Sequence, residues 1–202
     1  MPKIKICGLS RHCDIEAVNA QNPDYIGFVF AKSRRQVTPE QAAALRKNLN
    51  PNIIPVGVFI NEPPENILSL IQKGTIQMVQ LHGTEDEEYI KKLKSVTDAP
   101  IIKAIPVQNP GGVQKWENTA ADYLLLDNKT GGSGQNFNWD LIGKTTKPFF
   151  LAGGLNIDNI EKAIAAAAPY AVDISSGVET DGLKDPIKIS EIIKKIKSRR
   201  TK

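Results

Sequence analysis

The amino-acid sequence predicts an α/β fold, a single-domain (β/α)8 (TIM) barrel over residues 1–202. Eight short apolar runs begin about 20 to 28 residues apart, and the segments between them look helical. Strands that alternate with helices are typical of a parallel sheet with crossover helices, and a count of eight favours a closed barrel. An open doubly wound sheet is the alternative. Its nucleotide fingerprint G-x-G-x-x-G is absent after the first run, because Gly8 is followed by Leu9, Ser10 and Arg11.

The apolar runs are the expected strands, and alternation along a strand indicates which side chains share a face. In KIKIC, Ile4 and Ile6 lie on one side of a period-2 strand, and Lys5 and Cys7 lie on the other. Cys7 is therefore the last strand residue before a turn. The expected strands are residues 3–7, 25–30, 53–60, 76–81, 101–107, 122–127, 148–153 and 170–175.

The segments between the strands carry helix-forming patterns and start signals. Thr38 before Pro39-Glu40, Thr84 before EDEE, and Asn156 before IDNIEKA are the expected cap-like residues. Helical segments are expected at residues 39–49, 65–74, 86–96, 156–168 and 186–198.

Composition and charge exclude several classes of protein. The chain has 26 basic and 22 acidic residues and a net charge of +4, and the basic C-terminal tail explains the excess. This tail has no interleaved aromatic residues, so it predicts a solvated helix end and no nucleic-acid partner. No run approaches the length of a membrane span, and two cysteines cannot form a disulfide framework. We therefore expect no membrane association and a cytoplasmic location.

The loops after the seventh and eighth strands have the composition of an anion-binding site. Barrels often bind phosphate with these two loops, because backbone N–H groups approach an anion closely where side chains are small. Gly153 with Gly154 and Ser176 with Gly177 have this character. The GGSG segment at 131–134 is either a flexible lid or a second backbone cradle.

Two ionisable groups stand at strand ends on the rim where barrel active sites lie. Cys7 ends the first strand and Asp127 ends the sixth. Asp127 shares the inward face with Leu125, so a small substrate could lie between the thiol and the carboxyl group, with one removing a proton and the other donating one. Lys5 faces the barrel interior and needs an anionic partner there, either Asp127 or Asp173.

Further polar residues at strand ends are candidates for substrate contacts. Arg34 and Arg35 follow the second strand, where a guanidinium could bind a carboxylate or a phosphate through two hydrogen bonds. His82 follows the fourth strand and either contacts the ligand or makes a hydrogen bond at the strand end. Asp173, near the end of the eighth strand, is a further candidate. No metal-binding cluster is expected, because nothing resembles a pair of C-x-x-C motifs.

These motifs, in this order, resemble the phosphoribosylanthranilate isomerase family of tryptophan biosynthesis. The resemblance runs from residue 3 to about residue 185 and covers nearly every strand end. It is carried by KICGL around Cys7, GFVFAKSRRQVTPEQA at 27–42, VGVFIN at 56–61, VQLHG at 79–83, LLLDNKTGGSGQNFNW at 124–139, LAGGLNIDNI at 151–160 and VDISSGVE at 172–179.

The resemblance implies a cofactor-independent Amadori rearrangement of N-(5-phosphoribosyl)anthranilate. It assigns the general acid to Asp127, the general base to Cys7 and the substrate carboxylate contact to Arg35. It assigns phosphate binding to the backbone of Gly153, Gly154, Ser176 and Gly177. The expected partner is thus a small phosphorylated sugar-anthranilate substrate, and the expected assembly is a monomer or a homodimer.

The sequence departs from the family pattern at two positions and leaves two other functions open. Arg34 stands where the family usually has proline, which leaves open whether Arg34 or Arg35 contacts the carboxylate, and Asn138 replaces a common aspartate. One alternative is a non-catalytic phosphate-sugar binding barrel. The other is the related isomerase of histidine biosynthesis, which is disfavoured because its base at the Cys7 position is an aspartate.

Overall fold

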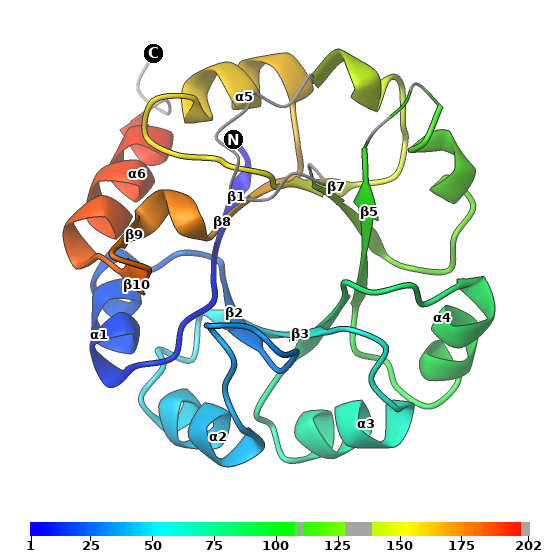
Figure 1. The fold of residues 1–202 in the computed structure, drawn as a ribbon, viewed down its shortest axis with the longest axis horizontal. Helices are drawn as coiled ribbons and strands as arrows, with labels where there is room; N and C mark the ends of the chain where they lie inside the picture. Colours follow the sequence, from blue (N-terminus) through cyan, green and yellow to red (C-terminus); the bar gives the residue numbers. More distant parts are fainter. Residues whose placement is uncertain (108, 110, 128–138, 199–202) are drawn as a thin grey trace.

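The eight predicted strands form a closed barrel in the computed structural model, which describes residues 1–107, 109, 111–127 and 139–198. Each strand pairs in parallel with the next, and β8 closes the barrel on β1 (Figure 1). The predicted fold class is therefore confirmed. The strands are β1 Lys3–Cys7, β2 Tyr25–Val29, β3 Ile54–Phe59, β4 Met78–Leu81, β5 Ile101–Pro106, β6 Tyr123–Asp127, β7 Phe149–Leu151 and β8 Ala171–Ile174.

Helices surround the barrel, although not after every strand (Figure 1). In the described residues, only the 3-10 turns η1 Gln114–Trp116 and η2 Trp139–Ile142 follow β5 and β6. Gly111 precedes η1 with a φ of +83°, and Gly143 follows η2 with a φ of +62°, conformations that do not belong to a helix. The helices are α1 His12–Gln21, α2 Pro39–Lys47, α3 Pro64–Gln72, α4 Glu87–Lys94, α5 Ile160–Ala167 and α6 Pro186–Ser198.

The strand faces follow the alternation that the sequence predicts. Ile4 and Ile6 belong to the core between strands and helices, and so do Leu124 and Leu126. Leu125 belongs instead to the cluster that fills the barrel interior. Residues at odd positions of β1 and β6 therefore point toward the barrel axis, which brings polar groups at the carboxyl ends of these strands to one place.

Of the three predicted helix caps, one is right and two are displaced. The Thr38 side chain accepts a hydrogen bond from the Gln41 N–H at 3.2 Å and caps α2. The cap of α4 is Asp86 and not Thr84, because the Asp86 carboxylate accepts from the Tyr89 N–H at 2.9 Å. Asn156 instead stabilises a turn that precedes α5.

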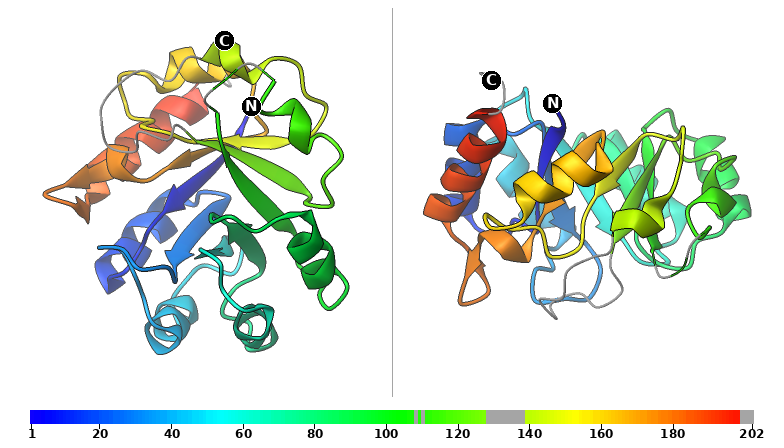
Figure 2. Two further views of the ribbon diagram at one scale, coloured as in Figure 1. Left: turned by 45° about the vertical axis from the view of Figure 1, so that its right-hand side comes forward. Right: turned by 90° about the horizontal axis from the view of Figure 1, so that it is seen from above.

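A short hairpin lies between β8 and α6, and the sequence analysis did not predict it. After the 3-10 turn η3 Ser176–Val178, strands β9 Glu179–Thr180 and β10 Leu183–Lys184 pair in antiparallel fashion. Asp181 and Gly182 both have positive φ, +52° and +79°, as the two-residue loop of a type I′ hairpin requires. Figure 2 shows this hairpin projecting beside α6.

No helix in the described ranges has both the length and the apolar character needed to cross a membrane.

Candidate active site

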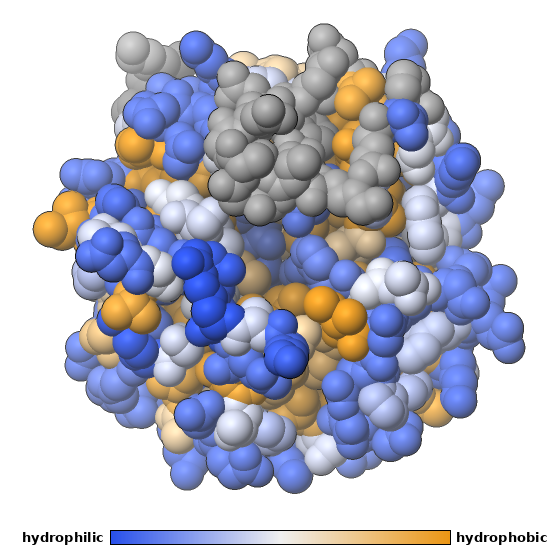
Figure 3. All heavy atoms as spheres, viewed as in Figure 1, coloured by the Kyte–Doolittle hydropathy of each residue, from blue (hydrophilic) through white to orange (hydrophobic). Residues whose placement is uncertain are grey.

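A cavity of about 590 Å³ opens at the carboxyl ends of the barrel strands. Figure 3 shows the hollow near the centre of this face, with hydrophilic and hydrophobic residues side by side around it. The predicted site residues that line it are Cys7, Arg35, His82, Asp127, Gly153, Gly154, Asp173 and Ser176. Chain segments far apart in the sequence thus meet at one cavity, as a barrel dictates.

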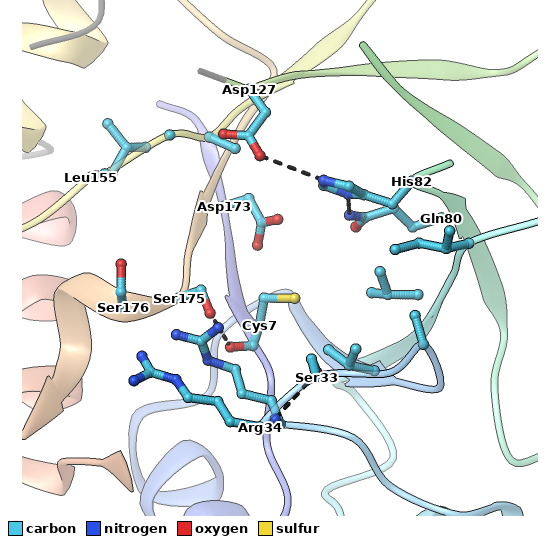
Figure 4. Close-up of a pocket in the computed structure, with 18 of the residues that line it drawn as sticks. Cys7, Ser33, Arg34, Gln80, His82, Asp127, Leu155, Asp173, Ser175 and Ser176 are labelled. Atoms are coloured by element: carbon cyan, nitrogen blue, oxygen red, sulfur yellow. Dashed lines mark hydrogen bonds and ion pairs between the residues drawn. The ribbon is translucent and has the colours of Figure 1, made fainter. Parts of the chain in front are cut away.

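The Cys7 thiol and the Asp127 carboxyl group enter the cavity from different strands. Figure 4 shows the Cys7 sulfur, from the end of β1, and the Asp127 carboxyl group, from the end of β6, both pointing into it. Cys7 is buried, at 8% exposure, and the Asp127 side chain is 30% exposed. A ligand in this cavity can therefore meet a thiol and a carboxyl group at once.

Beneath Cys7 lies a buried ion pair that answers a question left open by the sequence. Lys5 donates to both carboxylate oxygens of Asp173, at 2.9 and 3.0 Å, so its partner is Asp173 and not Asp127. Burial alone would lower the pKa of Lys5, but the negative charge of Asp173 and its hydrogen bonds with Lys5 raise it overall. Lys5 therefore stays a cation inside the barrel, directly below the thiol.

The Cys7 thiol is held mainly in its protonated form by its surroundings. Burial raises its pKa above the ordinary value, and the charge of Asp173 raises it further. The positive charges of Lys5 and Lys184 act in the opposite direction. A thiolate formed here would be a stronger base than a free cysteine, with two ammonium groups close by to stabilise it.

His82 connects Asp127 to a residue that the sequence analysis missed. His82 Nε2 lies 3.5 Å from Asp127 Oδ2, and His82 Nδ1 lies 2.9 Å from Gln80 Nε2 (Figure 4). Because an amide nitrogen can only donate, Gln80 makes Nδ1 the acceptor and leaves the proton of neutral His82 on Nε2, facing Asp127. Among the described residues, the buried Gln80 Oε1 has no hydrogen-bond partner. The signal in the sequence was a polar residue two positions before His82, on the same strand face.

The glycines after β7 line the cavity, whereas the glycine after β8 lets two loops pack together. Gly153 and Gly154 line the cavity with φ of +85° and +69°, which is backbone geometry that favours glycine. Gly177 is not among the described residues that line the cavity. A Cβ atom there would lie 1.9 Å from the Leu155 carbonyl oxygen. Its missing side chain therefore allows the two loops to pack together.

The Gly177→Ala variant should lose roughly 3 kcal/mol of folding free energy, since the added methyl group meets backbone that cannot move aside cheaply. A Gly74→Ala variant is the control, because Gly74 has a φ of +67° but open space around it. Backbone strain alone should cost this control about 1–2 kcal/mol. Urea unfolding curves measure both losses, and a Gly177→Ala loss no larger than that of the control would contradict the packing argument.

Both candidate arginines bind one carboxylate, that of Glu179. Arg35 donates to it through Nε at 2.6 Å and Nη2 at 2.9 Å, and Arg34 donates through Nη2 at 2.6 Å. The ammonium group of Lys184 is a third donor, at 2.6 Å. Burial would raise the pKa of Glu179, but the hydrogen bonds and charges of Arg35 and Lys184 lower it to about 2. Sequence reasoning did not find this cluster.

Arg35 lies closer to Cys7 than its position in the chain suggests. Its Cδ would be 2.4 Å from a Cβ atom on Gly8, the residue after Cys7, so the absence of a side chain at Gly8 makes room for Arg35. The Arg35 side chain is 23% exposed, compared with 58% for Arg34. The structure thus places Arg35 against the wall that carries the thiol.

Two features of the sequence analysis fall outside the described residues: the GGSG segment at 131–134 and Asn138. Within the described ranges, no group of three or more His, Cys, Asp or Glu side chains is arranged to hold a metal ion.

The fold and the cavity define a (β/α)8-barrel enzyme with a carboxyl group, a thiol and cationic groups at the mouth of its cavity. A family model described as N-(5'phosphoribosyl)anthranilate (PRA) isomerase matches residues 4–195. The chain belongs to this family, which confirms the resemblance.

Known members of the family match nearly the whole length of the chain. An N-(5'-phosphoribosyl)anthranilate isomerase of Endomicrobium trichonymphae is 48% identical, over 98% of this chain and 100% of its own. A solved phosphoribosyl anthranilate isomerase in complex with reduced 1-(o-carboxyphenylamino)-1-deoxyribulose 5-phosphate is 35% identical, with a TM-score of 0.85. A solved structure of monomers generated from the dimeric isomerase of Thermotoga maritima is 36% identical, also with a TM-score of 0.85. Each of these two structures aligns over 98% of this chain and 100% of its own.

Proposed function

We propose that this protein converts N-(5-phosphoribosyl)anthranilate to 1-(2-carboxyphenylamino)-1-deoxyribulose 5-phosphate, with Asp127 as general acid and Cys7 as general base. The observation that carries the proposal is the presence of a thiol and a carboxyl group on different walls of one cavity. The Amadori rearrangement requires a donated proton and a removed proton on neighbouring parts of one sugar, and these two groups match that need.

The proposed reaction begins with ring opening. The Asp127 carboxyl group gives its proton to the ribose ring oxygen, the C1–O bond breaks, and the nitrogen lone pair forms a C1=N iminium. This cation acidifies the neighbouring C2–H, so a modest base suffices. The Cys7 thiolate takes the C2 proton, and the C–H electron pair forms C1=C2 while the C=N electrons return to nitrogen. The resulting enolamine then becomes the ketone by losing its O2 proton and gaining a proton at C1.

The remaining residues fit the two ends of this substrate. We assign the anthranilate carboxylate to Arg35, because Arg35 lies against Gly8 beside Cys7 and is less exposed than Arg34. We assign the phosphate to the backbone after β7 and β8, at Gly153, Gly154 and Ser176, which line the cavity, and at the adjacent Gly177, which does not. Small residues at these positions let N–H groups approach an anion.

Two further polar residues would face the sugar between these ends. Asp173 and His82 line the same cavity and are assigned to contacts with the substrate. The ligand in the solved relative, reduced 1-(o-carboxyphenylamino)-1-deoxyribulose 5-phosphate, has the carboxylate, sugar chain and phosphate that these assignments require.

The proposal is tested by incubating the purified protein with phosphoribosylanthranilate and following the loss of substrate fluorescence. We expect a catalysed loss that scales with protein concentration and is inhibited by the reduced product analogue. Fluorescence that decays only at the rate of the protein-free sample would reject the proposed reaction. The same sample would then support the non-catalytic phosphate-sugar binding barrel if it still bound the analogue.

Other expectations accompany this function and stay predictions. They are a single domain over residues 1–202, a monomer or homodimer, a cytoplasmic location, no cofactor and no nucleic-acid partner. A relative from Thermotoga maritima is described as dimeric, which is compatible with the homodimer.

A further inference from the structure

Glu179 is a buried carboxylate that stands behind the proposed substrate site. Its side chain is 4% exposed, and it is not among the described residues that line the cavity. It accepts hydrogen bonds of 2.6 to 2.9 Å from Arg34, Arg35 and Lys184. Nothing in the proposed mechanism uses Glu179, although charged hydrogen bonds this short and this buried fix the side chains that make them.

The contact between Glu179 and Arg35 leaves one edge of the Arg35 guanidinium group available for a second carboxylate. Glu179 takes the side formed by Nε and Nη2, and in the described part of the chain Nη1 makes no hydrogen bond. A guanidinium has five N–H donors in one plane, so its end, formed by Nη1 and Nη2, can hold a second carboxylate while its side holds the first. Glu179 therefore orients Arg35 without occupying the edge that the substrate needs.

Lys184 connects this carboxylate to the wall that carries Cys7. The Lys184 side chain is 2% exposed, and its ammonium group donates to Glu179 at 2.6 Å and to the Ser175 carbonyl at 2.9 Å. The Ser175 hydroxyl in turn donates to the Cys7 carbonyl at 3.0 Å. Through Lys184 and Ser175, the position of Glu179 is thus tied to the end of β1.

We propose that Glu179 is a positioning residue for substrate recognition. It holds the Arg35 guanidinium side-on, so that the free end of this group receives the substrate carboxylate at a fixed place relative to Cys7. This inference rests on the proposed role of Arg35, and it makes the hairpin of β9 and β10 part of the specificity of the site.

The alternative role for Glu179 is competition with the substrate carboxylate for the arginines. The two roles predict opposite changes in ligand affinity when the charge of Glu179 is removed, so an affinity measurement distinguishes them. If Glu179 only competed with the substrate for the arginines, then removing its charge would tighten the binding of a carboxylated ligand. If Glu179 positions Arg35, then removing its charge frees the guanidinium to move and weakens that binding.

The test compares two ligands that differ only in the carboxylate. One is reduced 1-(o-carboxyphenylamino)-1-deoxyribulose 5-phosphate, and the other is the same compound with a plain phenylamino group. Calorimetry measures the dissociation constants for the wild-type protein, for Glu179→Gln and for Glu179→Asp. The aspartate variant keeps the charge opposite Lys184 but withdraws the oxygens by one methylene group, so it is informative if the glutamine variant does not fold.

We expect the substituted proteins to bind the carboxylated ligand about tenfold more weakly, as the loss of one charged hydrogen-bond arrangement predicts. Binding of the phenylamino ligand should stay unchanged, and KM should rise more than kcat falls. Lys188→Met is the matched control: this exposed lysine donates to the backbone oxygen of Glu179 at 2.8 Å and should be dispensable for both ligands.

Tighter or unchanged binding of the carboxylated ligand by a folded variant would overturn the proposal. An equal loss of affinity for both ligands would also overturn it, because general damage to the cavity weakens the binding of both ligands alike. Equal binding of both ligands by the wild-type protein would refute the proposal together with the role of Arg35. The fluorescence assay on Cys7 and Asp127 would still decide the catalytic assignment by itself.

Discussion

Replacing Asp127 with asparagine should lower turnover by roughly 10²- to 10⁴-fold, the usual contribution of a general acid. Asparagine has nearly the same shape, so its amide group can keep the place of the carboxyl group, 3.5 Å from His82 Nε2. What it lacks is a carboxyl proton for the ring oxygen. The loss should therefore appear in kcat, measured by substrate fluorescence, while calorimetry shows that the reduced product analogue still binds.

A second aspartate, immediately before the same strand, provides the control for this variant. Asp122 accepts hydrogen bonds from Lys94 at 2.6 and 2.7 Å and does not line the cavity. Asp122→Asn should retain turnover and lose only stability. An Asp127→Asn protein that turns over substrate at the wild-type rate would remove Asp127 from the mechanism.

The sequence was sufficient to predict which strand residues face the barrel axis. In a period-2 strand, a single apolar residue that must be buried under a helix fixes the direction of its neighbours. The burial of Ile4 and Ile6 under the helices thereby directs the Cys7 side chain toward the barrel axis. The burial of Leu124 and Leu126 does the same for Asp127. Once the number of strands indicates a barrel, its geometry brings such residues together at one end.

The partners of charged groups were less predictable, since they depend on distances between loops and not on periodicity. Lys5 needed an anion, but two aspartates were equally compatible with strand parity, and only the β1–β8 register selects Asp173. Glu179 and Lys184 lie on a hairpin of two-residue strands, too short to produce a recognisable alternation. The contact between Glu179 and Arg35 joins residues that are 144 positions apart along the chain.

Replacing Cys7 with alanine should lower turnover by a similar factor, roughly 10²- to 10⁴-fold, because no base then faces the sugar C2.

The removal of the C2 proton should also show a characteristic pH dependence. Burial and Asp173 raise the pKa of the Cys7 thiol, so near neutral pH most of the free protein carries the inactive thiol. As the pH increases toward the raised pKa, the thiolate fraction grows by about tenfold per pH unit. Because the general acid Asp127 must keep its proton at the same time, the increase is isolated in the residual kcat/KM of Asp127→Asn, which has no carboxyl proton to lose.

The thiol that titrates can be identified directly in a Cys13→Ser background. Cys13 is the other cysteine, exposed on α1 and absent from the cavity wall, so this variant should keep full turnover. The rate of iodoacetamide modification then reports the Cys7 thiolate alone, and it should follow the same pH curve as the residual kcat/KM of Asp127→Asn. A residual kcat/KM of Asp127→Asn that does not change with pH, while modification of Cys7 increases, would mean that another group removes the C2 proton. Parallel curves that both vanish in Cys7→Ala would assign the base to the thiol at the end of β1, where the positive charges of Lys5 and Lys184 stabilise the form that reacts.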